Sequence, residues 1–78
     1  MDTIEMQEFF ATRWKMQGSL ANGDELSTVE LPYKPNGATV YESCWFYARG
    51  GSEVVAHYFS KADAVEGHCE LLGAAARG

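Results

Sequence analysis

Two runs of β-forming residues, joined by a glycine turn and followed directly by a helix cap, constrain this chain more than any other feature. The runs cover about Thr39 to Tyr47 and Glu53 to Phe59, and both are rich in β-branched and aromatic side chains. Arg49-Gly50-Gly51-Ser52 lies between them and suits a tight connection. We therefore expect the two runs to pair as an antiparallel hairpin.

The length of the connection predicts the register of this hairpin. With a loop of those four residues, Cys44 lies opposite His57 and Glu42 lies opposite Phe59. A one-residue bulge would shift every pair beyond it.

The last part of the chain predicts a helix that begins after Ser60. Ser60 suits the N-cap, and Asp63 follows three residues later, where a capping box usually has Glu or Gln. Gly67 costs about 1 kcal/mol relative to alanine inside a helix, which indicates close packing of the helix backbone on the sheet. We expect the helix to end at Gly73. Its apolar face has helical spacing and consists of Val65, His68, Cys69 and Leu72.

The first part of the chain predicts another helix, from about Thr3 to Gln17. Met6, Phe10 and Trp14 are spaced by four residues and alternate with charged positions, which is typical of an amphipathic helix. Gly18 suits its end, and Asn22-Gly23 marks a turn in the polar loop that follows.

A short strand is expected at about Leu26 to Leu31, ended by Pro32, with a turn at Lys34-Pro35-Asn36-Gly37. With the hairpin and the two helices it completes one domain covering residues 1–78. The sequence therefore predicts the α+β class: a three-stranded antiparallel sheet with N-terminal and C-terminal helices, in the order α-β-β-β-α.

The composition limits the function classes that a chain of 78 residues can serve. Its net charge of -5 repels phosphate backbones, and its six basic residues are scattered, so we expect no direct binding of nucleic acid. No stretch approaches the length of a membrane span, and two cysteines are too few for a disulfide framework. These features favour a cytoplasmic protein that does not bind membranes.

Four residues have side chains that can carry chemistry: Cys44, His57, His68 and Cys69. They lack the spacing of a zinc site, and nothing in the sequence supplies an oxyanion hole for a cysteine nucleophile. We expect no metal, no cofactor and no catalytic residue. Glu42, His57 and His68 are instead predicted to form a structural polar cluster, in which either histidine could satisfy Glu42.

The aromatic residues favour a binding function. Alternation places Tyr41, Trp45 and Tyr47 on one face of the sheet, together with Tyr58 of the next strand. Both faces are apolar enough to need cover. The N-terminal helix covers this aromatic face, or a second copy of the chain does, or the face is left as an interaction surface.

Three segments together resemble a family of small bacteriophage-encoded proteins of unknown function. The family pattern is Ser-Thr-Val-x-Leu, then Phe-Glu-Thr-Met-Val-Phe, then Arg-Tyr-x-Thr and an Ala-x-x-Gly-His helix. The chain is similar to it at residues 27–31, at residues 41–46, and at residues 57–60 leading into residues 64–68. It departs from the pattern at Cys44 and Trp45, where the family has Met-Val, and in a shorter loop after Pro32.

The resemblance implies a phage-encoded protein. Together with the aromatic face and the lack of catalytic spacing, it leads us to expect an accessory protein that is not an enzyme and acts by protein–protein contact in the host cytoplasm. Such a protein could modulate or inhibit a host enzyme or a defence complex, and its partner could be a host or a phage protein. Two alternatives stay open at this point. One is a small hydrolase or metal-binding protein that uses Cys44, His57 and His68, and the other is a virion or assembly component.

Overall fold

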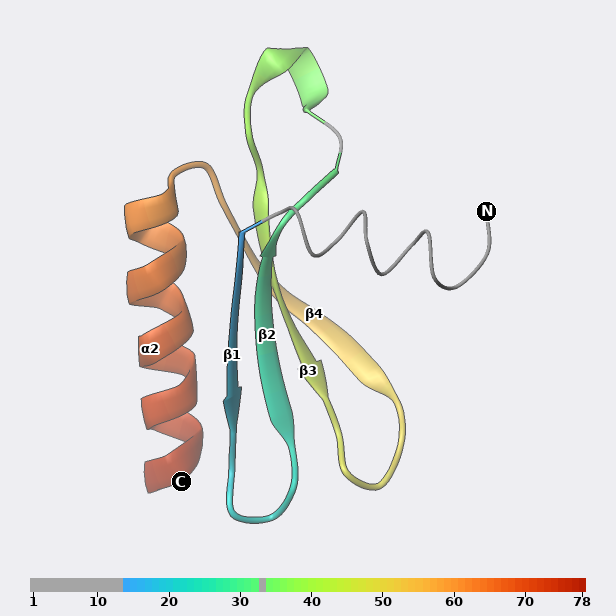
Figure 1. Cartoon of the computed structure of the whole chain (residues 1–78). Helices are drawn as coiled ribbons and strands as arrows, with labels where there is room; N and C mark the ends of the chain where they lie inside the picture. The colour runs from blue at the N-terminus through green and yellow to red at the C-terminus, as the bar shows by residue number, and fades with distance from the viewer. Residues whose placement is uncertain (1–13, 33) are drawn as a thin grey trace.

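The computed structural model describes residues 14–32 and 34–78, which form an antiparallel sheet with one helix packed on it (Figure 1). The sheet has four strands in the order β1-β2-β3-β4, so every strand pairs with its neighbour in the sequence. The α+β class and the C-terminal helix are confirmed, whereas the prediction of three strands is wrong. The elements are β1 (Lys15–Ser19), β2 (Glu25–Glu30), the 3₁₀ turn η1 (Pro35–Gly37), β3 (Tyr41–Phe46), β4 (Ser52–Tyr58) and α2 (Lys61–Arg77).

Strand β1 replaces the end of the predicted N-terminal helix. That helix was expected over residues 3–17, but Lys15 to Gln17 belong to β1, and the rest of the expected helix lies outside the described residues except Trp14. The strand pairs antiparallel with β2, from Lys15 opposite Val29 to Ser19 opposite Glu25. The Asn22-Gly23 turn therefore closes a hairpin, with Gly23 at a φ of 95° that suits glycine.

The β2–β3 pair forms the centre of the sheet. Leu26 lies opposite Trp45, and Thr28 lies opposite Ser43. Beyond the two strands, the backbone N–H of Leu31 donates to the carbonyl of Val40 at 2.8 Å, so the ladder continues toward η1. The predicted turn is confirmed at η1, where the N–H of Gly37 donates to the carbonyl of Lys34.

The predicted β3–β4 hairpin is confirmed, but its predicted register is wrong. Glu42 lies opposite His57, and Cys44 lies opposite Val54. One cause is the loop, which turns earlier than expected because Gly50 and Gly51 both adopt positive φ. The other cause is a bulge in β4, where Val55 is the added residue.

Helix α2 begins as the sequence predicts and ends later. The Ser60 hydroxyl accepts the backbone N–H of Asp63 at 3.1 Å, which confirms the N-cap. The helix passes through Gly73 and runs to Arg77, so the predicted end is wrong. Its buried residues are Ala64 and His68, whereas Cys69 is exposed and therefore does not belong to the apolar face as predicted. Val65 is likewise exposed.

Two glycines let the helix lie close to the sheet. A Cβ atom on Gly67 would lie 2.5 Å from the Tyr58 hydroxyl oxygen, which confirms the close packing inferred for this glycine. On β1, a Cβ atom on Gly18 would meet the side chain of Leu72 at 2.5 Å. The helix thus contacts all four strands, and its contact face fixes which side of the sheet is covered.

Candidate functional site

The sheet has two faces of different character. The face under α2 carries Thr28, whose hydroxyl bonds to His68 of the helix, and Tyr58, which lies against Gly67. Because side chains alternate along a strand, the residues next to Thr28 on β2 and next to Tyr58 on β4, and their partners on β3, point to the opposite side of the sheet. We call that side the open face, and its central residues are Val29, Glu42, Cys44, Phe46, Val54 and His57.

Large apolar side chains are exposed at the β3–β4 end of the open face. Phe46 is 48% exposed and Val54 is 50% exposed. Val55, the residue that the bulge adds, is also exposed. We call Phe46, Val54 and Val55 the apolar patch. Phe59, just beyond the end of β4, is exposed as well.

A polar pair borders this patch on the same face. Nε2 of His57 lies 3.1 Å from a carboxylate oxygen of Glu42, directly across the β3–β4 ladder. Both side chains are accessible to water, so the pair contributes little to stability. Of the three residues expected in a polar cluster, Glu42 and His57 lie together, whereas His68 lies on the other face of the sheet.

Two members of the candidate aromatic surface are buried. Tyr41 is 7% exposed and Trp45 is 8% exposed, so of the arrangements left open above, these two residues do not form a free interaction surface. Tyr58, which pairs with Tyr41, is half-buried against α2. The C-terminal helix covers this face, and Trp14 adds an edge-to-face contact with Tyr41 at 5.5 Å between ring centroids.

Tyr47 follows β3 on the same side of the sheet as Trp45, but it is only half-buried. Its hydroxyl donates to Glu53 at 3.2 Å. Partial desolvation, followed by the hydrogen bond to Glu53 and the Glu53 charge, raises the pKa of Tyr47 above its ordinary value. Tyr47 therefore stays a neutral hydrogen-bond donor at physiological pH.

A buried hydrogen-bond network joins the sheet to the helix. The Thr28 hydroxyl lies 2.6 Å from the Ser43 hydroxyl and 2.7 Å from Nδ1 of His68. The Ser43 hydroxyl in turn donates to the Tyr58 hydroxyl at 3.1 Å. Burial lowers the pKa of the His68 imidazole, so this histidine is neutral in the folded chain at pH 7.

Burial gives this network a structural role. Thr28, Ser43 and His68 are shielded from solvent, so a substrate cannot reach them. The network satisfies polar groups that would otherwise be costly inside a small core. Sequence reasoning missed Thr28 and Ser43. The sequence does contain a signal for them, because Thr28 and Ser43 are small polar residues at positions that face the core on two neighbouring strands.

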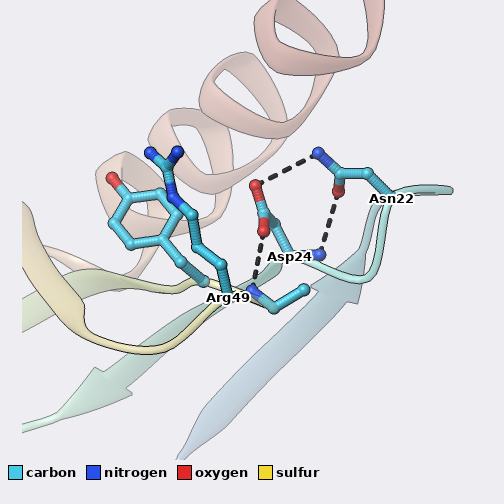
Figure 2. A pocket seen from close by; sticks show the side chains of 5 residues that line it. Asn22, Asp24 and Arg49 are labelled. Carbon is cyan, nitrogen blue, oxygen red and sulfur yellow. Dashed lines mark hydrogen bonds between the residues drawn. The ribbon is translucent and has the colours of Figure 1, made fainter.

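A shallow surface hollow of about 370 Å³ lies where the two hairpin turns meet (Figure 2). Its floor is organised by Asp24, whose carboxylate accepts the backbone N–H of Ala48 at 2.8 Å and the side-chain amide of Asn22 at 3.2 Å. One carboxylate oxygen thus fastens the β3–β4 turn to the β1–β2 turn, and the other holds Asn22 within the β1–β2 turn. Tyr47 and Arg49 complete the lining, and the arrangement holds the loops together.

The candidate hydrolase and metal residues are separated by the sheet. Cys44 and His57 lie on the open face, while His68 lies beneath α2. The thiol of Cys44 lies 3.6 Å from the carbonyl oxygen of Trp45, and both cysteines are free. Among the described residues, no group of three or more histidines, cysteines or carboxylates is placed to hold a metal ion.

Comparisons with known proteins give no relative for this chain. No family model, no curated protein and no solved structure matches it. Within the described residues, no helix is both long enough and apolar enough to cross a membrane.

Proposed function

We propose that this protein acts by contact with another protein, as a small accessory protein of the phage type that modulates a host enzyme or defence complex. The observation that supports this function is the apolar patch, in which Phe46 and Val54 are exposed on the open face and Val55 is exposed at the bulge beside Val54. Exposed apolar clusters on small proteins usually mark binding sites. A partner would gain most by covering this patch.

The surroundings of the patch fit a protein partner. Interfaces commonly have an apolar centre with a polar rim, and the exposed Glu42–His57 pair lies beside Val54 on the same face. The net charge of -5 disfavours nucleic acid as the partner. The free cysteines fit the reducing cytoplasm that we propose as the place of action.

Affinity capture with a matched pair of variants tests this function. Val54→Asp places a charge in the apolar patch, whereas Val65→Asp places the same charge on α2, where Val65 is also exposed. Each variant and the unchanged chain are used as bait in extracts of the cell that makes the protein, after circular dichroism has shown that each is folded.

A partner that the unchanged chain and Val65→Asp both capture, and that Val54→Asp loses, is the expected result. A partner retained equally by both variants contradicts binding at the patch. Recovery of no partner by the unchanged chain contradicts the interaction itself.

A further inference from the structure

The two edges of the described sheet differ in how they are protected (Figure 1). Strand β1 forms one edge and has only five residues, with the exposed Lys15 at its start. A short edge strand and a lysine on it are two features by which natural proteins keep an edge from pairing with another chain. Strand β4 forms the other edge, and its seven residues make it the longest strand of the sheet.

Strand β4 lacks both of these features. It contains neither lysine nor proline, and its two adjacent valines, Val54 and Val55, are exposed. Its acidic side chain, Glu53, accepts a hydrogen bond from the Tyr47 hydroxyl of the same hairpin. A long edge strand with exposed β-branched residues is a template for pairing with an extended segment of another chain. Protection of this edge therefore requires a different feature.

The bulge at Val55 interrupts the β4 edge near its middle. Val54 lies opposite Cys44 and Ala56 lies opposite Ser43, so Val55 is an added residue between two pairs. A regular incoming strand matches an edge only where the outward N–H and C=O groups of that edge repeat every two residues. The added residue breaks this repeat and leaves only residues 52–54 on one side and residues 56–58 on the other. Each of these runs is at the lower limit of strand length, so neither supports a stable pair.

We infer that the bulge at Val55 protects the β4 edge against strand addition by another chain. A sheet binds a protein either through main-chain hydrogen bonds at its edge or through side chains on its face. With the β4 edge protected, a partner at this end of the sheet is limited to side-chain contacts on the open face, where Phe46 and Val54 are exposed. The protection of the edge does not depend on the proposed function, and its test needs no partner.

Deletion of Val55 tests this inference and leaves the other pairs of the hairpin in register. Val54 and Ala56 become neighbours and keep Cys44 and Ser43 as their partners, so β4 becomes a regular strand. In sedimentation equilibrium, the deletion variant is expected to self-associate, with an apparent mass about twice that of the unchanged chain or more. Val55→Ala is the matched control, because it keeps the added residue and removes most of its apolar side chain. This control should have the same apparent mass as the unchanged chain.

Hydrogen exchange followed by nuclear magnetic resonance locates the association. In the unchanged chain, the amide protons of β4 that point away from β3 should exchange rapidly at every protein concentration. In the deletion variant, the corresponding amide protons should become protected, and their protection should increase with protein concentration. The amide protons of α2 should exchange alike in both chains.

A folded deletion variant with the same apparent mass as the unchanged chain overturns the inference. Association of the deletion variant without new protection in β4 does so too, because the contact then lies elsewhere. Equal association of Val55→Ala would assign the effect to the lost valine side chain. A deletion variant that circular dichroism shows to be unfolded would assign the added residue to the fold and not to the edge. In the unchanged chain itself, protection of the outward β4 amide protons that grows with concentration would show that the edge is open.

Discussion

Replacing Gly67 with alanine should destabilise this protein, although the same change normally stabilises a helix. The added Cβ would lie 2.5 Å from the Tyr58 hydroxyl oxygen and 2.6 Å from its Cζ, and closer still to Cε1. The ring cannot simply turn aside, because its hydroxyl is hydrogen-bonded to Ser43 in the buried network. Relief of this contact therefore disturbs the packing of the helix on the sheet and also breaks that hydrogen bond.

The magnitudes decide the sign of this effect. Alanine gains about 1 kcal/mol over glycine in a helix interior. Forcing an extra carbon into a packed contact costs about 1–3 kcal/mol, and losing the Ser43–Tyr58 hydrogen bond costs about 0.5–1.5 kcal/mol. The expected net loss is about 2 kcal/mol of unfolding free energy, which lowers the melting temperature of a domain this small by about 10 °C.

Urea denaturation of Gly67→Ala beside Gly73→Ala measures this effect. Gly73 is in the same helix, and a Cβ atom there would meet only the flexible end of Arg77, at 3.4 Å. Gly73→Ala is therefore expected to raise the free energy of unfolding by about 0.5–1 kcal/mol. A Tyr58→Val background should remove most of the cost of Gly67→Ala. If Gly67→Ala stabilises the chain as much as Gly73→Ala does, the close packing described for Tyr58 is refuted.

Two further predictions concern the buried network. Thr28→Val keeps the shape of the side chain but removes the hydroxyl that joins Ser43 to His68, so it should lower the free energy of unfolding by about 1–3 kcal/mol in urea denaturation. Thr39→Val is the matched control. Equal losses of unfolding free energy in the two variants would contradict the role of the network. Burial lowers the pKa of His68 in the folded chain, whereas in the unfolded chain His68 has the ordinary histidine pKa of about 6.5. Below that pH the unfolded chain binds more protons than the folded chain, so the free energy of unfolding should fall as the pH drops through about 6.5. Unfolding free energies at pH 7.5 and 5.5 should differ less in His68→Gln than in the unchanged chain, and an equal difference would assign the acid sensitivity to other groups.

Local signals in the sequence predicted much of the fold. Ser60 caps the last helix, and Gly67 lies against the sheet, because a capping hydroxyl and a missing side chain act within their own neighbourhood. The sequence also predicted that Tyr41, Trp45 and Tyr58 share a face. It did not predict which helix covers that face, because this depends on contacts between distant parts of the chain.

Strand β1 was missed because its sequence carries two periods at once. Trp14 completes a spacing of four residues with Met6 and Phe10, which is typical of a helix. Met16 and Gly18 also alternate with polar residues, which is the two-residue period of a strand. This alternation is too short to outweigh the helical spacing as a signal in the sequence. Pairing with β2 settles the conformation, and this pairing is not visible in either segment alone.

The candidate site was predictable only in part. The sequence identified Glu42 and His57 as candidate partners. It did not place them opposite each other, because their pairing depends on the β3–β4 register, which is set in part by the bulge at Val55. A bulge adds one residue without a distinctive composition, so the shift cannot be read from the sequence. The exposure of Phe46 and Val54 follows from this register and from the position of α2.

Hydroxyl-radical footprinting tests the central claim, that the open face of the sheet binds and the helix-covered face is core. In the free protein, Phe46 and Phe59 should be oxidised readily, while Tyr41 and Trp45 should be protected despite their greater intrinsic reactivity. Addition of the captured partner should protect Phe46 and leave the reactivity of Tyr47 and the protection of Tyr41 unchanged. Strong oxidation of Tyr41 and Trp45 in the free chain, or unchanged oxidation of Phe46 in the complex, would contradict the account.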